Sequence, residues 1–365
     1  MRSAYSFNSI TINGREIKLD HILTAVAEPL SPFEISTFSF IRSWFNEQDE
    51  YIQNTSGSTG IPKSIAIYRK QMVASAQLTQ QALHLRAGET ALVCLDTEYI
   101  AGKMMLVRSF TTDMKIVAVD PSANPFRDIQ SDVPIDFAAL VPFQVYEVIS
   151  SKYAHRLNSV RNILVGGAAL THEAQKSLAQ FTGHVYATYG MTETISHIAL
   201  QAVNGPLASG YFKVLPGIKI NTDLRGCLEI TAPYLSEKII TNDIVQIQDE
   251  HHFKWLGRSD NLINTGGIKL IPERIEAEIG KLFDEVKIGN KFLISSLPDP
   301  KFGNKVILLV EGSLAFDSTD LYERLKKILA PYEVPKNIYD NVKFVFTQNG
   351  KIDRRKTVQM MHNQI

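Results

Sequence analysis

The fold is decided by the stretch Asn162-Ile163-Leu164-Val165-Gly166-Gly167-Ala168-Ala169-Leu170, in which a short buried-strand run leads into a turn of small residues. The runs Ala91–Leu95, Lys115–Val119 and Phe137–Leu140 have a similar apolar character, and stretches with helical spacing separate them. Strands that alternate with helices are typical of an α/β fold with a largely parallel sheet. We therefore predict such a sheet here.

The organisation changes after about residue 205, where short strand patterns with turn signals predict a small β subdomain. A second α/β unit is predicted beyond Gly257. Its expected elements are the helices 273–283 and 320–329 and the strands 305–310 and 342–346. The predicted organisation is an N-terminal domain at 1–256, a connection at 257–260 and a C-terminal domain at 261–365.

Composition excludes several classes of protein. Lys+Arg and Asp+Glu number 38 each in 365 residues, so no global charge would attract nucleic acid or a membrane surface. The two cysteines, Cys94 and Cys227, provide neither a disulfide framework nor metal-ligand spacing. No apolar run approaches the ~20 residues of a membrane span, and no signal peptide is evident. We expect a cytoplasmic protein, with a homo-oligomer left open.

A loop rich in glycine and hydroxyl residues, Thr55-Ser56-Gly57-Ser58-Thr59-Gly60-Ile61-Pro62-Lys63, is the sharpest local feature. Glycines allow close backbone approach, and consecutive N–H groups with hydroxyls form a concave anion site. Lys63 adds a compact positive charge suited to phosphate. The alternative is a hairpin loop built from common turn formers.

The loop resembles the phosphate-binding signature of the adenylate-forming enzymes, which include acyl-CoA synthetases, peptide-synthetase adenylation domains and luciferases. Further segments resemble the same family in the family's order, over roughly residues 51–355. The resemblance implies a large N-terminal adenylate-forming domain with a small β subdomain, and a small mobile α+β C-terminal domain. Only about 50 residues precede the loop, so the N-terminal domain is expected to be shortened.

The resemblance also implies how nucleotide and metal are held. The turn Gly166-Gly167-Ala168 would contact adenine, although for this segment taken alone a strand-to-helix turn with Thr171 as N-cap is the better explanation. In Tyr189-Gly190-Met191-Thr192-Glu193, the ring would lie against adenine, Thr192 would contact the α-phosphate, and Glu193 would help to hold Mg²⁺.

The remaining motifs would bind ribose and move the C-terminal domain. Thr241-Asn242-Asp243 resembles the family's Thr–Gly–Asp, whose Asp accepts the ribose hydroxyls; Asn242 stands where Gly is usual. Arg258 would approach the ribose, and Asp260 would be the hinge. Gly266 and Gly267 would line the CoA channel. Lys351, in Asn349-Gly350-Lys351, would be the catalytic lysine, together with Thr192 and Glu193.

The acid is predicted from the helical stretch Glu98–Arg108, where Ala101, Met105 and Arg108 share one face. Arg108 on this apolar face suggests recognition of a carboxylate, with Lys103 or His197 as helpers. The alternatives are a snorkelling arginine and a histidine that only packs. This stretch is most similar to the o-succinylbenzoate–CoA ligases of menaquinone biosynthesis, in their compact bacterial form.

We therefore expect an ATP-dependent acid–CoA ligase that acts through an acyl-AMP and uses ATP, Mg²⁺ and CoA. Three alternatives stay open at this point. The acid could be another aryl or fatty acid, the acceptor could be a carrier protein instead of CoA, or the chain could be a non-catalytic relative that only binds nucleotide.

Overall fold

The computed structural model describes residues 6–54, 64–346 and 352–362, without the side chains of His172 and His362. The chain forms two compact units, each described by itself below. Unit 1 consists of Met1–Ile220, Ile230–Ile239 and Asp249–Phe253, and unit 2 consists of Asn221–Glu229, Ile240–Gln248 and Lys254–Ile365.

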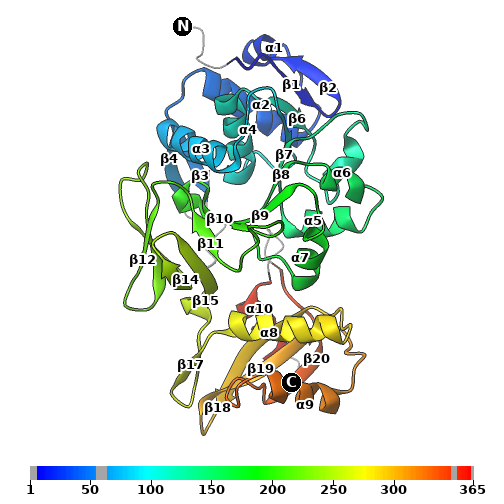
Figure 1. Ribbon diagram of the computed structural model, residues 1–365, viewed down its shortest axis with the longest axis vertical. Coiled ribbons are helices and arrows are strands. Elements are labelled where there is room, and N and C mark those ends of the chain that lie inside the picture. Colours follow the sequence, from blue (N-terminus) through cyan, green and yellow to red (C-terminus); the bar gives the residue numbers. More distant parts are fainter. Residues whose placement is uncertain (1–5, 55–63, 347–351, 363–365) are drawn as a thin grey trace. The chain divides into compact units, whose positions relative to one another are not determined.

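The centre of unit 1 is a sheet with the strand order β11-β10-β9-β8-β7-β5-β6-β1-β2 (Figure 1). Neighbouring strands from β9 to β6, and the pair β6–β1, run parallel, whereas β10, β11 and β2 pair in antiparallel fashion. The predicted α/β fold with a largely parallel sheet is thus confirmed. The strands are β1 Ser9–Ile12, β2 Arg15–Lys18, β5 Thr90–Val93, β6 Lys115–Ala118, β7 Phe137–Leu140, β8 Asn162–Val165, β9 His184–Gly190, β10 His197–Ala202 and β11 Phe212–Val214. A separate hairpin pairs β3 (Glu50–Asn54) with β4 (Ser64–Tyr68).

Helices cover both faces of the parallel strands. On one face, α5, α6 and α7 contribute Val145, Leu157 and Leu178 to a core that includes Leu92 and Ile163 of the strands. On the other face α4 packs against β5 and β6, and α3 packs against α4. The helices of unit 1 are α1 Leu19–Leu23, α2 Pro32–Phe45, α3 Arg69–Leu83, α4 Ile100–Thr112, α5 Pro142–Ile149, α6 Ala154–Asn158 and α7 His172–Leu178. Burial on two faces explains why these strands are apolar throughout.

Local chemistry sets the ends of these helices. Ser31 accepts a hydrogen bond from the Glu34 amide (3.2 Å) just before Pro32, a favoured first residue of a helix. Thr171 accepts from the Ala174 amide (3.2 Å), so the N-cap role considered for it is confirmed. His84 and Asp113 end α3 and α4 in the left-handed conformation (φ 52° and 55°).

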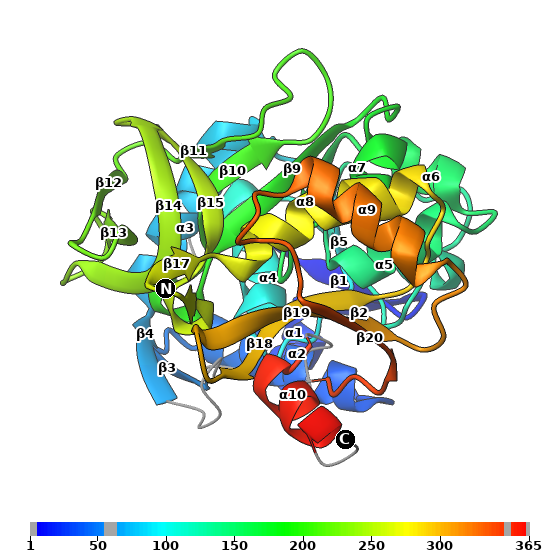
Figure 2. The ribbon, with the colours of Figure 1, turned by 90° about the horizontal axis from the view of Figure 1, so that it is seen from below.

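Unit 2 combines short strands with a separate α/β layer. The strands β12 (Lys219–Thr222), β13 (Cys227–Thr231) and β14 (Ile239–Asp249) lie next to one another, as expected for a small β subdomain. Strand β15 (His252–Arg258) begins in unit 1 and ends in unit 2. A sheet of β18 (Phe292–Asp299), β19 (Gly303–Glu311) and β20 (Asn337–Val342) carries α8 (Pro272–Glu285) and α9 (Ser318–Ile328) on one side and α10 (Arg354–His362) on the other (Figure 2).

One predicted strand is wrong. We expected residues 342–346 to form a strand, but β20 is Asn337–Val342, which pairs in parallel with β19 at the edge of its sheet. Most of β20 is exposed or half-buried, so its sequence lacks the apolar pattern of a central strand. Among the described residues, no helix combines the length and apolar character that crossing a membrane requires. The division at 257–260 stays a prediction.

Candidate active site

The turn at residues 166–168 and the Tyr189 motif meet at one edge of the sheet in unit 1. Strands β8 and β9 are parallel neighbours, with Val165 opposite Ala187, so their carboxyl ends lie side by side. A Cβ atom on Gly166 would lie 2.5 Å from Thr188 Oγ1, and one on Gly190 would lie 2.4 Å from the Ser196 carbonyl oxygen. Glycine is therefore required at position 190, where the backbone is close, whereas a larger residue at position 166 would displace the Thr188 hydroxyl. The carboxyl edge of a parallel sheet is where such folds bind ligands.

A strained turn follows β9 and directs two polar side chains inward. Thr194 holds the turn: its hydroxyl accepts from the Met191 amide (3.0 Å) and lies 2.8 Å from the Ser196 carbonyl oxygen. Ile195 has a φ of 69°, which is rare for a β-branched residue. Such strain persists only where surrounding contacts impose it, and it is typical of functional sites. Ser196 and His197 follow immediately.

The aromatic and acidic residues of this motif are differently placed. The Tyr189 ring packs edge-on against Phe212 and Phe253, with centroids 5.8 and 5.1 Å away, and is half-buried. Thr192 is half-buried and Glu193 is exposed. Within the described residues, no three His, Cys, Asp or Glu side chains group together as a metal site. One exposed carboxylate suits Mg²⁺, which keeps several waters and takes its other ligands from phosphates.

Arg108 is the most unusual charged residue of unit 1. Its side chain lies on α4 and is only 3% exposed, so the snorkelling alternative is wrong. The guanidinium donates to Thr79 Oγ1 (3.2 Å), to the Ser196 hydroxyl and, from Nη2, to His197 Nδ1 (3.4 Å). Nη1 has the Met105 sulphur at 3.8 Å. All these acceptors are neutral, and none of the ion pairs among the described residues includes Arg108.

Burial controls the charge state of this cluster. Desolvation lowers the pKa of Arg108 to about 10, so the guanidinium is still charged at neutral pH. Burial, reinforced by the Arg108 charge, lowers the pKa of His197 well below its usual value and keeps the ring neutral. Arginine can only donate, so Nδ1 of His197 accepts and Nε2 donates to Thr79 Oγ1 (3.1 Å). Burial raises the pKa of Tyr234, close to the guanidinium, to about 12.

Lys103 lies apart from this cluster. Five residues before Arg108, it points to a different side of α4, and its ammonium donates to Gln53 Oε1 (2.8 Å) on β3. Burial lowers its pKa, an effect that the charges of Glu98 and Asp96 partly offset. The structure thus brings His197 to Arg108 and places Lys103 beside the strand that precedes residue 55.

The motif that we predict to bind ribose lies in unit 2. Asp243 is buried on β14, and its Oδ1 accepts from Trp255 Nε1 (3.1 Å) and Arg258 Nη1 (3.5 Å). Arg258 also donates to Asp260 (2.7 Å). Asn242 has no positive φ, so the strand accepts a residue other than glycine here without strain. Three of the predicted residues, Asp243, Arg258 and Asp260, are therefore joined in one network.

The other predicted site residues in unit 2 are placed only in part. Gly266 and Gly267 have φ values of 56° and 83° and form the exposed two-residue turn between β16 (Ile263–Thr265) and β17 (Ile268–Leu270). That hairpin needs φ above zero at both positions, whatever else the glycines do. Residues 55–63 and Lys351 lie outside the described residues. Close to Lys351 in sequence, Arg354 donates to Glu276 (2.8 Å) and the Ile294 carbonyl oxygen (3.1 Å).

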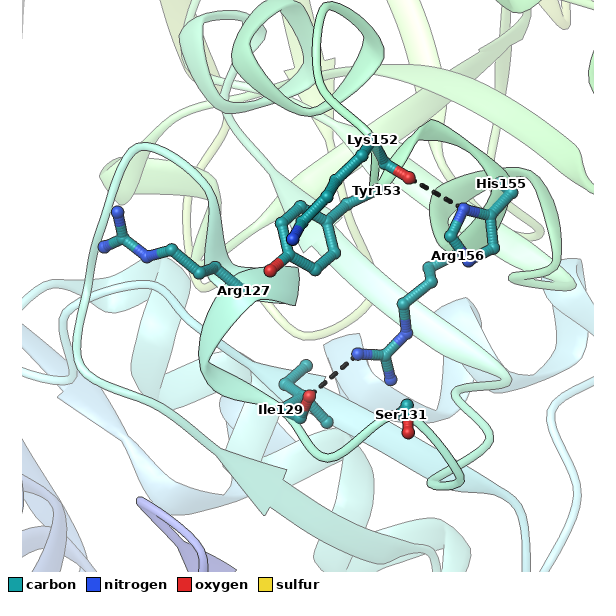
Figure 3. A pocket seen from close by; sticks show the side chains of 7 residues that line it. All are labelled: Arg127, Ile129, Ser131, Lys152, Tyr153, His155 and Arg156. Atoms are coloured by element: carbon teal, nitrogen blue, oxygen red, sulfur yellow. Dashed lines mark hydrogen bonds between the residues drawn. The ribbon is translucent and has the colours of Figure 1, made fainter.

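A basic hollow of about 270 Å³ lies in unit 1. Arg156 donates to the carbonyl oxygen of Ile129 (2.8 Å), and His155 Nδ1 lies 2.8 Å from the Lys152 carbonyl oxygen (Figure 3). Arg156 also donates to the Gln130 carbonyl oxygen (2.9 Å). The lining residues come from segments that lead into the amino ends of β7 and β8. The hollow therefore lies at the opposite edge of the sheet from Gly166 and Gly190, and Arg156 there serves to hold a loop.

Comparison with known proteins places this geometry in a family. The sequence pattern of the AMP-binding enzymes matches residues 40–221. A solved acyl-CoA synthetase (AMP-forming)/AMP-acid ligase II-like protein from Dyadobacter fermentans is 38% identical, with 93% of this chain and 97% of that chain covered and a TM-score of 0.62. The chain belongs to the AMP-binding enzyme family. By class it is an adenylate-forming acid–CoA ligase.

Two further relatives of this AMP-binding enzyme are more distant. The 2-succinylbenzoate–CoA ligase of Lactococcus lactis subsp. lactis is 25% identical in an alignment 371 positions long. The alignment covers 94% of this chain and 80% of the relative. A solved o-succinylbenzoate CoA synthetase from Bacillus subtilis, in complex with ATP and magnesium, has a TM-score of 0.71 at 19% identity, over 84% of this chain and 69% of that one. The latter likeness concerns the fold.

Sequence reasoning about this AMP-binding enzyme missed several residues of the site. Thr79, Ser196 and Tyr234 surround Arg108, and Trp255 contacts Asp243. The first three come from distant parts of unit 1, and no motif contains Thr79 or Tyr234. One signal existed: α3 places Ser75 and Thr79 one turn apart on a buried face, where polar side chains are uncommon.

Proposed function

We propose that this enzyme is an o-succinylbenzoate–CoA ligase. The observation that carries the proposal is Arg108, a buried guanidinium at the Ser196–His197 turn with neutral acceptors alone among the described residues. Burying a charge is costly unless a partner compensates it. An acid with a second, non-reacting carboxylate would supply that partner in the fork geometry that arginine favours.

The neighbours of Arg108 fit this task. Neutral His197 adds no competing positive charge, and Thr79 and Ser196 fix the guanidinium in place. Nη1, whose described partner is the weakly accepting sulphur of Met105, is the group with most to gain from a carboxylate oxygen. The 2-succinylbenzoate–CoA ligase named among the relatives acts on an acid of this kind, which supports the choice.

The reaction would proceed in two steps. In the first, an oxygen of the acid's reacting carboxylate attacks the α-phosphorus of ATP, and pyrophosphate leaves. We assign phosphate binding to residues 55–63 with Lys63, and positioning of the reactants to Thr192 and Lys351. Bound Mg²⁺, held in part by Glu193, would neutralise charge on the leaving pyrophosphate.

In the second step, the CoA sulphur attacks the acyl carbon, and AMP leaves. Within this proposal Gly166, Gly167, Ala168, Tyr189 and Gly190 hold adenine, Asp243 and Arg258 hold ribose, and Asp260 is the hinge. Gly266 and Gly267 would let the pantetheine chain pass close to the backbone. Since ATP and CoA are the co-substrates, the proposal places the reaction in the cytoplasm.

Pyrophosphate release tests the proposal. The assay contains ATP, Mg²⁺ and one acid at a time: o-succinylbenzoate, benzoate or a fatty acid, each with and without CoA. The proposal requires strong turnover in the presence of CoA with o-succinylbenzoate and with no other acid of the panel. Turnover with a different acid would keep the ligase class and discard this substrate. No turnover with any acid, together with saturable ATP binding, would favour the non-catalytic alternative.

A further inference from the structure

Asn242 connects two parts of unit 2 that the nucleotide motifs otherwise leave separate. Its side-chain amide lies on β14 and donates to both carboxylate oxygens of Asp260, at 3.1 and 3.3 Å. The amide oxygen accepts from Arg225 Nη1 (3.0 Å), so its orientation is fixed by a donor on one side and a carboxylate on the other. Glycine at this position could make none of these bonds.

Arg225 is itself held in place. Its Nε donates to Asp223 Oδ2 (2.8 Å), and Nη2 donates to the Thr241 carbonyl oxygen (3.1 Å). The guanidinium therefore presents Nη1 to Asn242 from a fixed position on the loop before β13. The clamp, as we call Arg225, Asn242 and Asp260 together, is thus anchored at the end away from the turn.

The turn at the other end of the clamp is also constrained. Gly257, with a φ of 156°, precedes it, and a Cβ atom there would lie 2.4 Å from Glu273 Oε2. Arg258 joins the Asp260 carboxylate to Asp243, the neighbour of Asn242. The side chains of residues 242 and 243 are therefore both connected to the turn 258–261.

The clamp can open without burying a charge. The Asp260 side chain is 29% exposed, and Asn242 is half-buried, so water can replace the bonds that are lost. Hydrogen bonds of this kind stabilise one conformation of the turn and still permit another.

We propose that Asn242 is a positioning residue that clamps Asp260 and so sets how readily the turn 258–261 moves between the two half-reactions. The structural part of this proposal stands on the hydrogen bonds alone. Its kinetic consequence rests on the proposed function, in which Asp243 binds ribose and Asp260 is the hinge. Asn242 acts on Asp260 and need not touch any substrate.

Hydrogen–deuterium exchange of the ligand-free full chain tests the clamp directly. In Asn242→Gly we expect amides of residues 258–262 to exchange at least about ten-fold faster, the effect of losing roughly one hydrogen bond to a charged group. Asn242→Asp, which puts two carboxylates together, should accelerate exchange further. The matched control is Gln246→Gly on the same strand. Gln246 is exposed, and its substitution also introduces a glycine into β14 but away from Asp260.

The kinetic readout compares acyl-AMP formation with thioester formation from preformed acyl-AMP. Asn242→Gly should change the ratio of the two rate constants at least about three-fold, whereas Gln246→Gly should leave it unchanged. Unchanged exchange in both Asn242 variants would overturn the clamp. Faster exchange with an equal change in both half-reactions would overturn the positioning role. An inactive wild type would refute the proposed function, while the exchange experiment would still decide the clamp.

Discussion

Replacing Arg108 with Met separates the two reasons for which a buried arginine could be present. Methionine has a similar length, fills the apolar part of the space and removes the charge. If Arg108 serves the substrate, the loss should fall on recognition of the second carboxylate. If it serves the fold, the loss should fall on stability.

The expected change in the free energy of unfolding follows from the pKa of Arg108. Lowering the pKa of Arg108 from 12.5 to about 10 corresponds to an unfavourable burial of about 3 kcal/mol at 1.36 kcal/mol per pKa unit. Methionine removes this cost but leaves Thr79, Ser196 and His197 short of a donor, at about 1 kcal/mol each. We expect the free energy of unfolding to stay within about 2 kcal/mol of the wild type.

The expected effect on substrate recognition is larger. Losing the cationic partner of a desolvated carboxylate costs about 2–5 kcal/mol. We expect kcat/KM for o-succinylbenzoate to fall by about 100-fold, which is about 2.7 kcal/mol. The analogue 4-oxo-4-phenylbutanoate has the same reacting carboxylate but no ring carboxylate, so its kcat/KM should hardly change.

The assay is pyrophosphate release with both acids for the wild type, Arg108→Met and Arg108→Lys, next to urea unfolding of each protein. Lysine keeps the charge and loses the fork, so its effect should be intermediate. An equal fall in kcat/KM with both acids, or destabilisation by more than about 4 kcal/mol, would exclude the role in substrate recognition and make Arg108 a structural residue.

Three further predictions concern the same structure. Because the pKa of folded His197 is lowered, the unfolded chain takes up its proton first as pH falls below about 6.5, and stability is lost there. Urea unfolding at pH 7.5 and 5.5 should therefore show about 1 kcal/mol less acid destabilisation in His197→Asn, and an identical pH dependence would contradict the neutral ring. Arg354→Met leaves the partly buried Glu276 carboxylate without its cation and should lower the free energy of unfolding by about 2–3 kcal/mol. The double variant with Glu276→Gln should regain part of this loss in the same unfolding assay. No recovery would argue against a stabilising ion pair between Arg354 and Glu276. Gly190→Ala places a Cβ atom 2.4 Å from the Ser196 carbonyl oxygen, so kcat/KM should fall at least about ten-fold. The control is Gly210→Ala, because Gly210 is exposed and has open space around it. Normal activity of Gly190→Ala would show that the turn adapts.

The sequence predicted best what burial and local chemistry determine. Strands Phe137–Leu140 and Asn162–Val165 were predicted with their observed bounds, because strands covered on both faces are short and apolar. The edge strand β20 was misplaced, since one open side removes that pattern. The motifs likewise assigned Gly166 and Tyr189 to one adenine site, and the strands that carry them, β8 and β9, are parallel neighbours.

The candidate site was predictable only where a residue belongs to a motif. Arg108 was found because a cation interrupts an apolar helix, and His197 because it follows Glu193 closely. Thr79 and Tyr234 could not be found, because their role comes from contacts between segments more than 25 residues apart in the chain. Asn242 was noted as a departure from a pattern, and only its contact with Asp260 supplies a reason.

Competition between acids in a single reaction shows whether this ligase selects an acid with two carboxylates. Equal concentrations of o-succinylbenzoate, 4-oxo-4-phenylbutanoate, benzoate and octanoate are mixed with ATP, Mg²⁺, CoA and the full chain, and the CoA thioesters are identified by mass. We expect o-succinylbenzoyl-CoA to be the dominant product, by about 100-fold over the thioester that lacks the ring carboxylate. A dominant thioester of any mono-carboxylic acid would contradict this selection.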